Sequence, residues 1–150
     1  MKIINSISIR GPIDRVFEFA CKVEYWPDLL PHYRRVSVIS DDGLSRIVEM
    51  DCIRSFGPLH WPCKWAARQV ILPAEWRIQF VHLAGPARGM TVEWRLESGG
   101  DVVHTTISHH LNHRLGSLYA DHIIGQLFVS EIAGKTLSTL KALVEAEDRR

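Results

Sequence analysis

Histidine side chains offer the most conspicuous chemistry in this sequence, because several of its eight histidines gather near one segment. The run His109-His110-x-x-His113, with His104 nearby, has the composition of a metal site. In a strand, however, His109 and His113 would share a face roughly 13 Å apart, too far for adjacent ligands of one ion, and His110 would face the other way. We therefore expect neither a metal site nor a bound cofactor.

His109 is the best placed of these histidines for chemistry. It shares the alternation of Val103, Thr105 and Ile107, which we assign to the inward side of a strand. An imidazole in that position could act as a general acid or base, or form a hydrogen bond with a ligand carbonyl or hydroxyl group. The alternative is a hydrogen-bonded histidine at the rim of the core, and the sequence leaves both interpretations open.

Other catalytic patterns are missing from the sequence. It contains no Gly-x-Ser-x-Gly elbow, and the segment Gly85-Pro86-Ala87-Arg88-Gly89 lacks the Gly-Lys-Ser/Thr ending of a phosphate-binding loop. Cys21, Cys52 and Cys63 form no Cys-x-x-Cys pair, which predicts free thiols. These observations argue against hydrolase chemistry and nucleotide binding.

The composition is that of an ordinary globular domain. The chain has 150 residues, of which 46% are hydrophobic and 23% charged, so we expect one domain over residues 1–150. A formal charge of +1 gives no reason to expect a nucleic-acid partner. Since no apolar stretch approaches the length of a membrane span, we expect no integral membrane association and a cytoplasmic location. Whether the chain forms a homodimer stays open.

The elements that must hold these side chains begin with a strand over residues 2–10. Gly11-Pro12 ends this strand, and Ile13, Val16, Phe17 and Ala20 then follow at helical spacing. The segment 25–31 has a proline suited to a first helical turn and another that stops it, which predicts a second, very short helix.

From Arg34 onward the pattern has period two and predicts six strands in meander order. One side of these strands is mostly apolar and includes four tryptophans, Trp61, Trp65, Trp76 and Trp94, whereas the other side is charged. The inward set is completed by Val36, Val38, Val48, Met50, Cys52, Cys63, Ala67, Ile78, Phe80, Met90, Val92 and Leu96.

The dry side of this sheet needs a cover, and the last third of the chain supplies one. Apolar residues recur at helical spacing from Gly116 to about Arg149, which predicts a helix roughly 50 Å long. A strongly curved sheet is not filled along its whole length by one helix, so space is expected between them. Aromatic residues and methionines on the inward side suit a pocket for a small apolar molecule, although they equally suit a plain core.

The order and spacing of several short motifs resemble the START/Bet v 1-like (SRPBCC) superfamily, and within it the polyketide cyclase/aromatase and coenzyme-Q-binding group. The motifs that carry the resemblance are Gly11-Pro12-x-x-x-Val16-Phe17, Trp26-Pro27-x-Leu29-x-Pro31-x-Tyr33, Trp65, Gly85-Pro86-x-x-x-Met90-x-x-x-Trp94 and Gly99-Gly100. The resemblance runs nearly end to end. It implies an α+β helix-grip fold: a seven-stranded curved antiparallel sheet, in the order strand, two helices, six strands and helix, wrapped around a long C-terminal helix.

The resemblance also implies a hydrophobic tunnel between sheet and C-terminal helix. In the aromatase/cyclases, a tyrosine after the short helices and an arginine beyond the tryptophan reach into it. Tyr33 matches the tyrosine, but Gln69 stands at the arginine position and Arg68 is one residue away. Because one residue reverses the face of a strand, Arg68 should point to water unless a bulge intervenes. Arg46 and Arg54 share the inward phase and are alternative cationic donors.

Two functions follow from these expectations. The first is a binding or carrier protein for a small hydrophobic molecule such as a polyketide, aromatic compound, quinone or lipid. The second is a polyketide cyclase/aromatase (dehydratase) that uses acid/base chemistry, with Tyr33, His109 and Arg68 as the candidate catalytic residues. In either case the predicted ligand-binding residues are Met50, Trp65, Gln69, Phe80, Met90, Trp94 and Phe128.

Overall fold

The computed structural model describes residues 2–56, 58–111 and 129–149. The first half of the described chain contains β1 (Lys2–Arg10), α1 (Ile13–Cys21), η1 (Val23–Tyr25), α2 (Trp26–Leu29), β2 (Tyr33–Asp41), β3 (Ser45–Phe56) and β4 (Leu59–Leu72). It is followed by η2 (Pro73–Glu75), β5 (Arg77–Ala84), β6 (Thr91–Gly99), β7 (Val102–His110) and α4 (Ser130–Asp148). The predicted order of elements is thereby confirmed.

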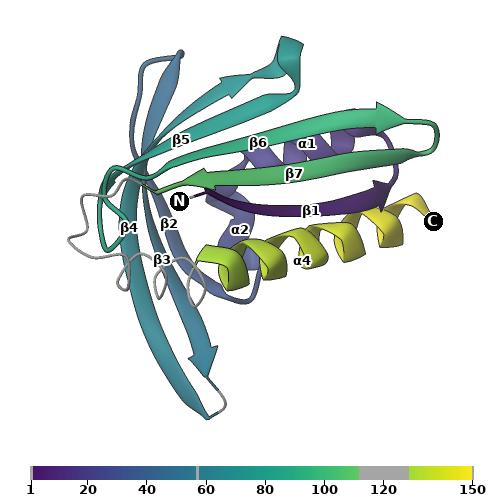
Figure 1. The fold of residues 1–150 in the computed structure, drawn as a ribbon. Helices are drawn as coiled ribbons and strands as arrows, with labels where there is room; N and C mark the ends of the chain where they lie inside the picture. The colour runs from purple at the N-terminus through teal and green to yellow at the C-terminus, as the bar shows by residue number, and fades with distance from the viewer. Residues whose placement is uncertain (1, 57, 112–128, 150) are drawn as a thin grey trace.

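The strands form one seven-stranded antiparallel sheet in the order β1-β7-β6-β5-β4-β3-β2. Consecutive strands pair from β2 to β7, and β1 closes the series by pairing with β7. The sheet is strongly curved and α4 lies across its hollow side (Figure 1). The predicted α+β helix-grip fold is therefore confirmed.

The N-terminal helix begins where the sequence pattern places it. Pro12 immediately precedes α1, and its carbonyl accepts hydrogen bonds from the backbone amides of Arg15 and Val16 at 3.1 and 3.2 Å. The residues with helical spacing, Val16, Phe17 and Ala20, are the buried ones, so α1 closes one end of the core.

The C-terminal helix packs its buried face against β1 and α1. Its buried residues are Ala133, Thr136, Leu137, Leu140 and Val144. At 19 residues it is about 28 Å long. The helix that we predicted starts at Gly116, and the part of that prediction over residues 112–128 lies outside the described residues.

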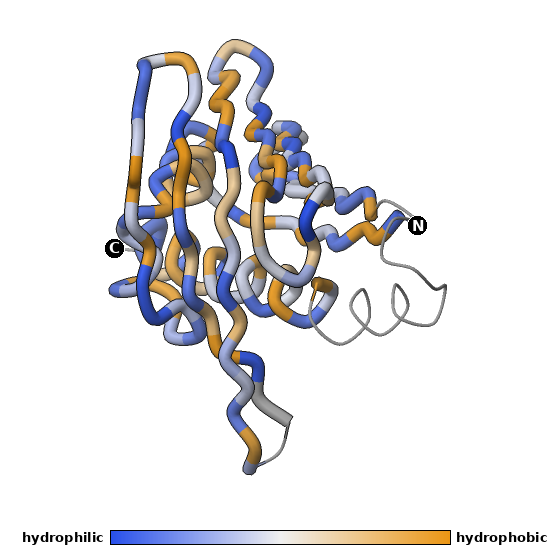
Figure 2. The backbone as a smooth tube through the Cα atoms, turned by 90° about the vertical axis from the view of Figure 1, so that its left-hand side faces the viewer, coloured by the Kyte–Doolittle hydropathy of each residue, from blue (hydrophilic) through white to orange (hydrophobic). Residues whose placement is uncertain are grey.

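The alternation of apolar and polar residues is visible along the strands as orange and blue segments (Figure 2). It assigns the buried face correctly at Val48, Met50, Phe80 and Trp94, each at most 6% exposed. Within the described part of the chain, no helix is long and apolar enough to cross a membrane.

Two inward assignments are wrong. Trp61 is 58% exposed and Val38 is 39% exposed, although both share the phase of buried neighbours. Trp61 lies near the turn of the β3–β4 hairpin, and Val38 lies on β2, which is an edge strand. Trp76, which is also predicted to face inward, is partly buried and packs against the core: it precedes β5 in a left-handed conformation (φ 53°) and lies edge-on to Phe17, with 5.3 Å between the ring centroids. Phase alone does not bury a side chain where the sheet has no cover.

Candidate functional site

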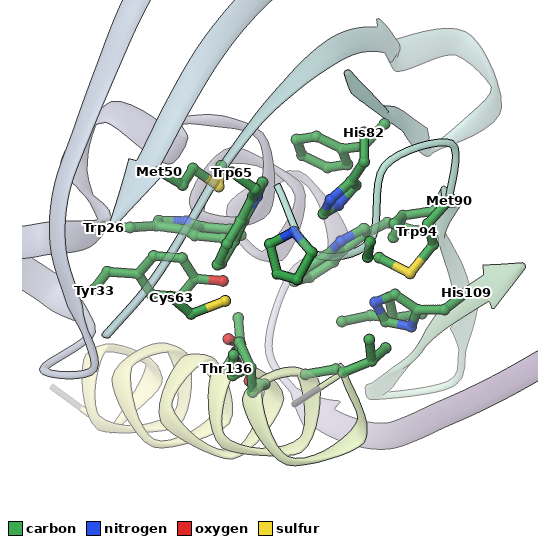
Figure 3. A pocket seen from close by; sticks show the side chains of 18 residues that line it. Trp26, Tyr33, Met50, Cys63, Trp65, His82, Met90, Trp94, His109 and Thr136 are labelled. Atoms are coloured by element: carbon green, nitrogen blue, oxygen red, sulfur yellow. Dashed lines mark hydrogen bonds between the residues drawn. The ribbon is translucent and has the colours of Figure 1, made fainter. Parts of the chain in front are cut away.

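A cavity that opens to solvent lies between the sheet and α4 (Figure 3). Its walls are aromatic and aliphatic: Trp26, Tyr33, Met50, Trp65, Phe80, Pro86, Ala87, Met90, Val92, Trp94, Ile107, Val129, Ile132 and Ala133. Polar groups enter from Cys63, His82, His109 and Thr136, in addition to the Tyr33 hydroxyl. None of the described lining residues is Lys, Arg, Asp or Glu, so the cavity carries no formal charge from them.

A cluster of rings forms the wall near the short helices. Trp26, from α2, packs against Tyr33 at 4.9 Å and against Trp94 at 5.9 Å between ring centroids. The Trp26 indole donates its Nε1 hydrogen to the carbonyl of Phe19 at 2.9 Å, which ties α2 to α1. This bond uses the polar edge of the indole, so its apolar face is free to line the cavity.

Two histidines face the cavity from β5 and β7, the two strands that flank β6 (Figure 3). His109, on β7, is 7% exposed, and burial lowers its pKa to about 3, helped by nearby His82 and His110. His82, on β5, is half-buried and stacks on Trp65 at 5.8 Å, and burial lowers its pKa to about 4. Both imidazoles are therefore neutral at pH 7. Neither Nδ1 atom has a hydrogen-bond partner among the described residues.

Tyr33 and Thr136 supply hydroxyl groups away from His109 (Figure 3). Thr136 donates to the carbonyl of Ile132 at 2.8 Å, and its oxygen lies 2.9 Å from Nε2 of buried His32. Because the Thr136 hydrogen is already used, His32 donates to Thr136 through Nε2. Burial raises the pKa of Tyr33 well above its usual range, with a smaller opposing contribution from a hydrogen bond to Thr136. Tyr33 is therefore a neutral phenol at pH 7.

Cys63 lines the cavity opposite Cys52 in the β3–β4 pair. Both are free thiols, as the sequence predicts, and both are buried. Burial raises the pKa of both, to about 12 for Cys52, so both are protonated and weakly nucleophilic at pH 7.

The position predicted to bind ligand through Gln69 serves another purpose. Gln69 is fully buried but lies outside the cavity lining. Its Oε1 accepts hydrogen bonds from Arg46 at 3.0 and 2.6 Å, and its Nε2 donates to the carbonyl of Cys21 at 2.9 Å. Arg46 also forms an ion pair with Glu24 at 2.8 Å. This polar cluster holds the segment after α1 against β3 and β4.

The candidate arginines all lie outside the cavity lining. Arg68 is exposed on the outer face of β4, as the strand alternation predicts, so the structure gives it no contact with the cavity. A register shift does occur between Ala66 and Ala67 in the β4–β5 pair, but it leaves Arg68 outside. Arg54 lies 3.7 Å from Glu131 of α4, and Arg46 belongs to the Gln69 cluster.

The structure brings together most of the residues that the sequence singled out. Those lining the cavity are Tyr33, Met50, Trp65, Phe80, Met90, Trp94 and His109. Phe128 lies outside the described residues. Sequence reasoning did not select Trp26, His82 or Thr136, although Trp26 belongs to the motif before Tyr33 and Thr136 lies one turn before buried Leu140 on α4. The alternation could also have found His82, because it shares the phase of Ile78 and Phe80, which are buried, whereas Val81 and Leu83 beside it are exposed.

No grouping of three or more His, Cys, Asp or Glu side chains that could hold a metal ion occurs in the described ranges. His104, which belonged to the histidine group considered above, instead forms a hydrogen bond with Ser8 on β1 at 2.9 Å.

Residues 9–133 match the family described as "Polyketide cyclase / dehydrase and lipid transport". No curated protein matches the sequence. The fold is similar to that of the Zhui aromatase/cyclase from Streptomyces sp. R1128, with a TM-score of 0.78, 18% identity, and coverage of 97% of this chain and 93% of that one.

Two further solved structures share the fold across most of both chains. Ara h 8.0201 has a TM-score of 0.77 at 10% identity and is covered over 98% of its length by 97% of this chain. A START superfamily protein from Mycobacterium smegmatis has a TM-score of 0.71 at 10% identity, with 97% of each chain covered. At these identities the likeness concerns the fold and not the activity.

Proposed function

Because this chain belongs to the polyketide cyclase / dehydrase and lipid transport family, we propose that it is a binding or carrier protein that holds a small hydrophobic molecule in the cavity. The observation that carries the proposal is the character of the cavity wall. It is built from aromatic rings, methionines and aliphatic side chains, with few polar groups and no charged one among the described residues. Such walls are typical of sites that bury apolar ligands.

We assign ligand contact to Met50, Trp65, Phe80, Met90 and Trp94. They come from β3, β4, β5, the end of the β5–β6 loop and β6, so they surround the space from several directions. The methionines can adapt to the shape of a guest, and the aromatic rings supply large apolar surfaces.

Acid/base catalysis of polyketide cyclisation is the second candidate, because Tyr33 and His109 both reach the cavity. The pKa values of these two side chains argue against acid/base catalysis. An efficient general base has a pKa near the working pH, whereas that of His109 is lowered to about 3 and that of Tyr33 is raised by burial. The one arginine proposed for catalysis, Arg68, is exposed on the outer face of the sheet. These features favour carriage over turnover.

The proposal is tested by titrating the protein with N-phenyl-1-naphthylamine, a fluorescent apolar probe. This uncharged probe is preferred to 1-anilinonaphthalene-8-sulfonate, which is charged. Trp94→Ala removes a large part of the cavity wall and should lower the affinity about tenfold or more, since a buried aromatic side chain contributes roughly 1.5–3 kcal/mol. Trp61→Ala is the matched control, because Trp61 is exposed and outside the cavity lining.

Should Trp94→Ala fail to fold, half-buried Trp65→Leu provides the same comparison with less disturbance of the core. Equal affinity of wild type, Trp94→Ala and Trp65→Leu for the probe would reject the cavity as the binding site.

A further inference from the structure

The polar atoms of the cavity leave hydrogen bonds unmade at one side, and this restricts what the ligand can be. We rest this inference on the proposed function, because it concerns the occupant of the same cavity. His82 and His109 both line it, and the Nδ1 atom of each ring is buried without a partner among the described residues. Buried polar atoms are nearly always hydrogen-bonded, so unpaired ones in a ligand cavity indicate a bond that the ligand completes.

Each of the two histidines has a defined place in the sheet. His82 stacks on Trp65 with an angle of 18° between the ring planes, and its backbone amide donates to the carbonyl of Met90 at 2.9 Å. His109 lies on β7 opposite Ile3 and Val92 in the neighbouring strands. Thus the pair is a fixed part of the wall, and a guest must match it.

The described lining residues offer no counter-charge to an anionic or cationic guest. Both imidazoles are neutral at pH 7, because burial lowers their pKa to about 4 and about 3. None of the described lining residues offers a permanent charge. A carboxylate or ammonium group buried among these side chains would lose its hydration without gaining a counter-charge from them, which is strongly unfavourable.

A hydroxyl group is the uncharged group that fits two neutral imidazoles best. Each ring has one nitrogen that donates and one that accepts, and which nitrogen carries the hydrogen differs with the tautomer. A hydroxyl both donates and accepts, so it can pair with either nitrogen, whereas a carbonyl or ether oxygen only accepts.

We infer that His82 and His109 form a specificity site that selects uncharged, ring-shaped ligands carrying a hydroxyl group over plain hydrocarbons and over carboxylates. The aromatic wall holds the ring, and the imidazole pair binds the hydroxyl. No step of catalysis is involved.

The experiment compares three probes of nearly the same shape, 2-naphthol, 2-methylnaphthalene and 2-naphthoate, by isothermal titration at pH 7. The measured quantity is the ratio of the 2-naphthol and 2-methylnaphthalene affinities, because the contribution of the shared rings cancels. This ratio should fall about threefold to tenfold from wild type to the His82→Phe/His109→Phe double variant, as expected for the loss of one net hydrogen bond. His110→Phe, which changes the exposed histidine next to His109, should leave the ratio unchanged.

Wild-type protein alone gives an independent measurement that does not need the variants to fold. 2-Naphthoate should bind at least about tenfold more weakly than 2-naphthol, because its charge is buried unpaired. An unchanged ratio in the double variant, or tighter binding of 2-naphthoate, would overturn the specificity site while 2-methylnaphthalene binding still upholds the proposed function. If none of the three probes binds, the proposed function fails as well, and so does the inference that rests on it.

Discussion

Thr136 connects two buried aromatic side chains through one hydroxyl group. It bonds to its own helix at Ile132, receives the Nε2 hydrogen of His32, and contributes to the environment of Tyr33. The His32 and Tyr33 rings are 4.7 Å apart, so the three side chains form one unit between β2 and α4. Nδ1 of His32 has no hydrogen-bond partner among the described residues. The hydrogen bond to Thr136 is therefore the one that the His32 ring makes to a described side chain.

Thr136→Val should therefore destabilise the protein by about 1–3 kcal/mol, the range for a buried donor left unsatisfied. The shape of the side chain is conserved, so the loss reports the hydrogen bonds. Urea unfolding followed by circular dichroism measures it. Thr139→Val is the matched control, because half-buried Thr139 bonds to its own helix in the same way, to Lys135 at 2.8 Å, but this hydrogen bond is exposed. A loss as small in Thr136→Val as in Thr139→Val would show that His32 does not depend on this bond.

Residue type alone could not separate wall from surface. Trp61 and Trp94 are identical side chains with the same predicted phase, yet one is 58% exposed and the other 3%. Trp94 lies on β6, in the middle of the sheet, whereas Trp61 pairs with Arg54 near the turn of the β3–β4 hairpin. The difference depends on where the cover ends, and that is a property of the whole sheet.

At the scale of elements, the loop between β5 and β6 brings Pro86, Ala87 and Met90 to the cavity. The loop starts at Gly85, whose φ is 110° and where a Cβ would lie 2.7 Å from the Lys64 carbonyl oxygen and 2.8 Å from the Trp65 Cβ. Only glycine permits both the conformation and this close approach to β4.

Gly85→Ala should accordingly lower the free energy of unfolding by more than backbone strain alone would. It should also weaken binding of an apolar probe, because the loop must move away from β4. Gly43→Ala isolates the strain: Gly43 has φ 87° but nothing within 4 Å of an added Cβ. We expect roughly 1–2 kcal/mol for Gly43→Ala and at least about 1–2 kcal/mol more for Gly85→Ala. Thermal unfolding and probe titration of both variants measure these effects, and equal losses of stability would show that the contact with β4 is relaxed without cost.

Periodicity could predict the element order, the buried phase of the central strands and the helix-grip architecture, because each depends on local alternation and on one cover for one dry face. It could not predict the role of Gln69, since the partner that satisfies it, Arg46, is brought next to it by the pairing of β3 with β4. Nor could it predict that Trp76, just before β5, has a left-handed conformation.

For the whole molecule, three histidines are kept neutral by the fold. Burial lowers the pKa of His32 and His82 to about 4 and that of His109 to about 3, from the ordinary value of about 6.5. In the unfolded chain these rings take up protons as the pH falls below about 6.5, whereas in the folded protein they do not until pH 3–4. The unfolded state then binds more protons, so stability is complete above about pH 6.5 and declines as the pH falls toward the folded-state values.

Each such histidine should remove roughly 2 kcal/mol of stability between pH 7.5 and pH 5. Midpoints of urea unfolding over this range should therefore fall steeply with acidification. In His109→Phe, the slope of the unfolding midpoint against pH should be reduced by about one third, because one of the three histidines that take up a proton on unfolding is missing. A pH-independent midpoint in wild type would contradict the neutral state of these rings, and an unchanged slope in His109→Phe would exclude His109 from the linkage.

The order of the strands in the sheet also determines when, during synthesis, the chain becomes able to bind a ligand. β1 has its sheet partner in β7, about a hundred residues later, and the floor of the cavity is α4, which follows all seven strands. While the ribosome is still making the strands, the concave face has no floor and the first strand has no neighbour in the sheet. A guest can therefore be captured only after α4 has been made and has packed against the sheet.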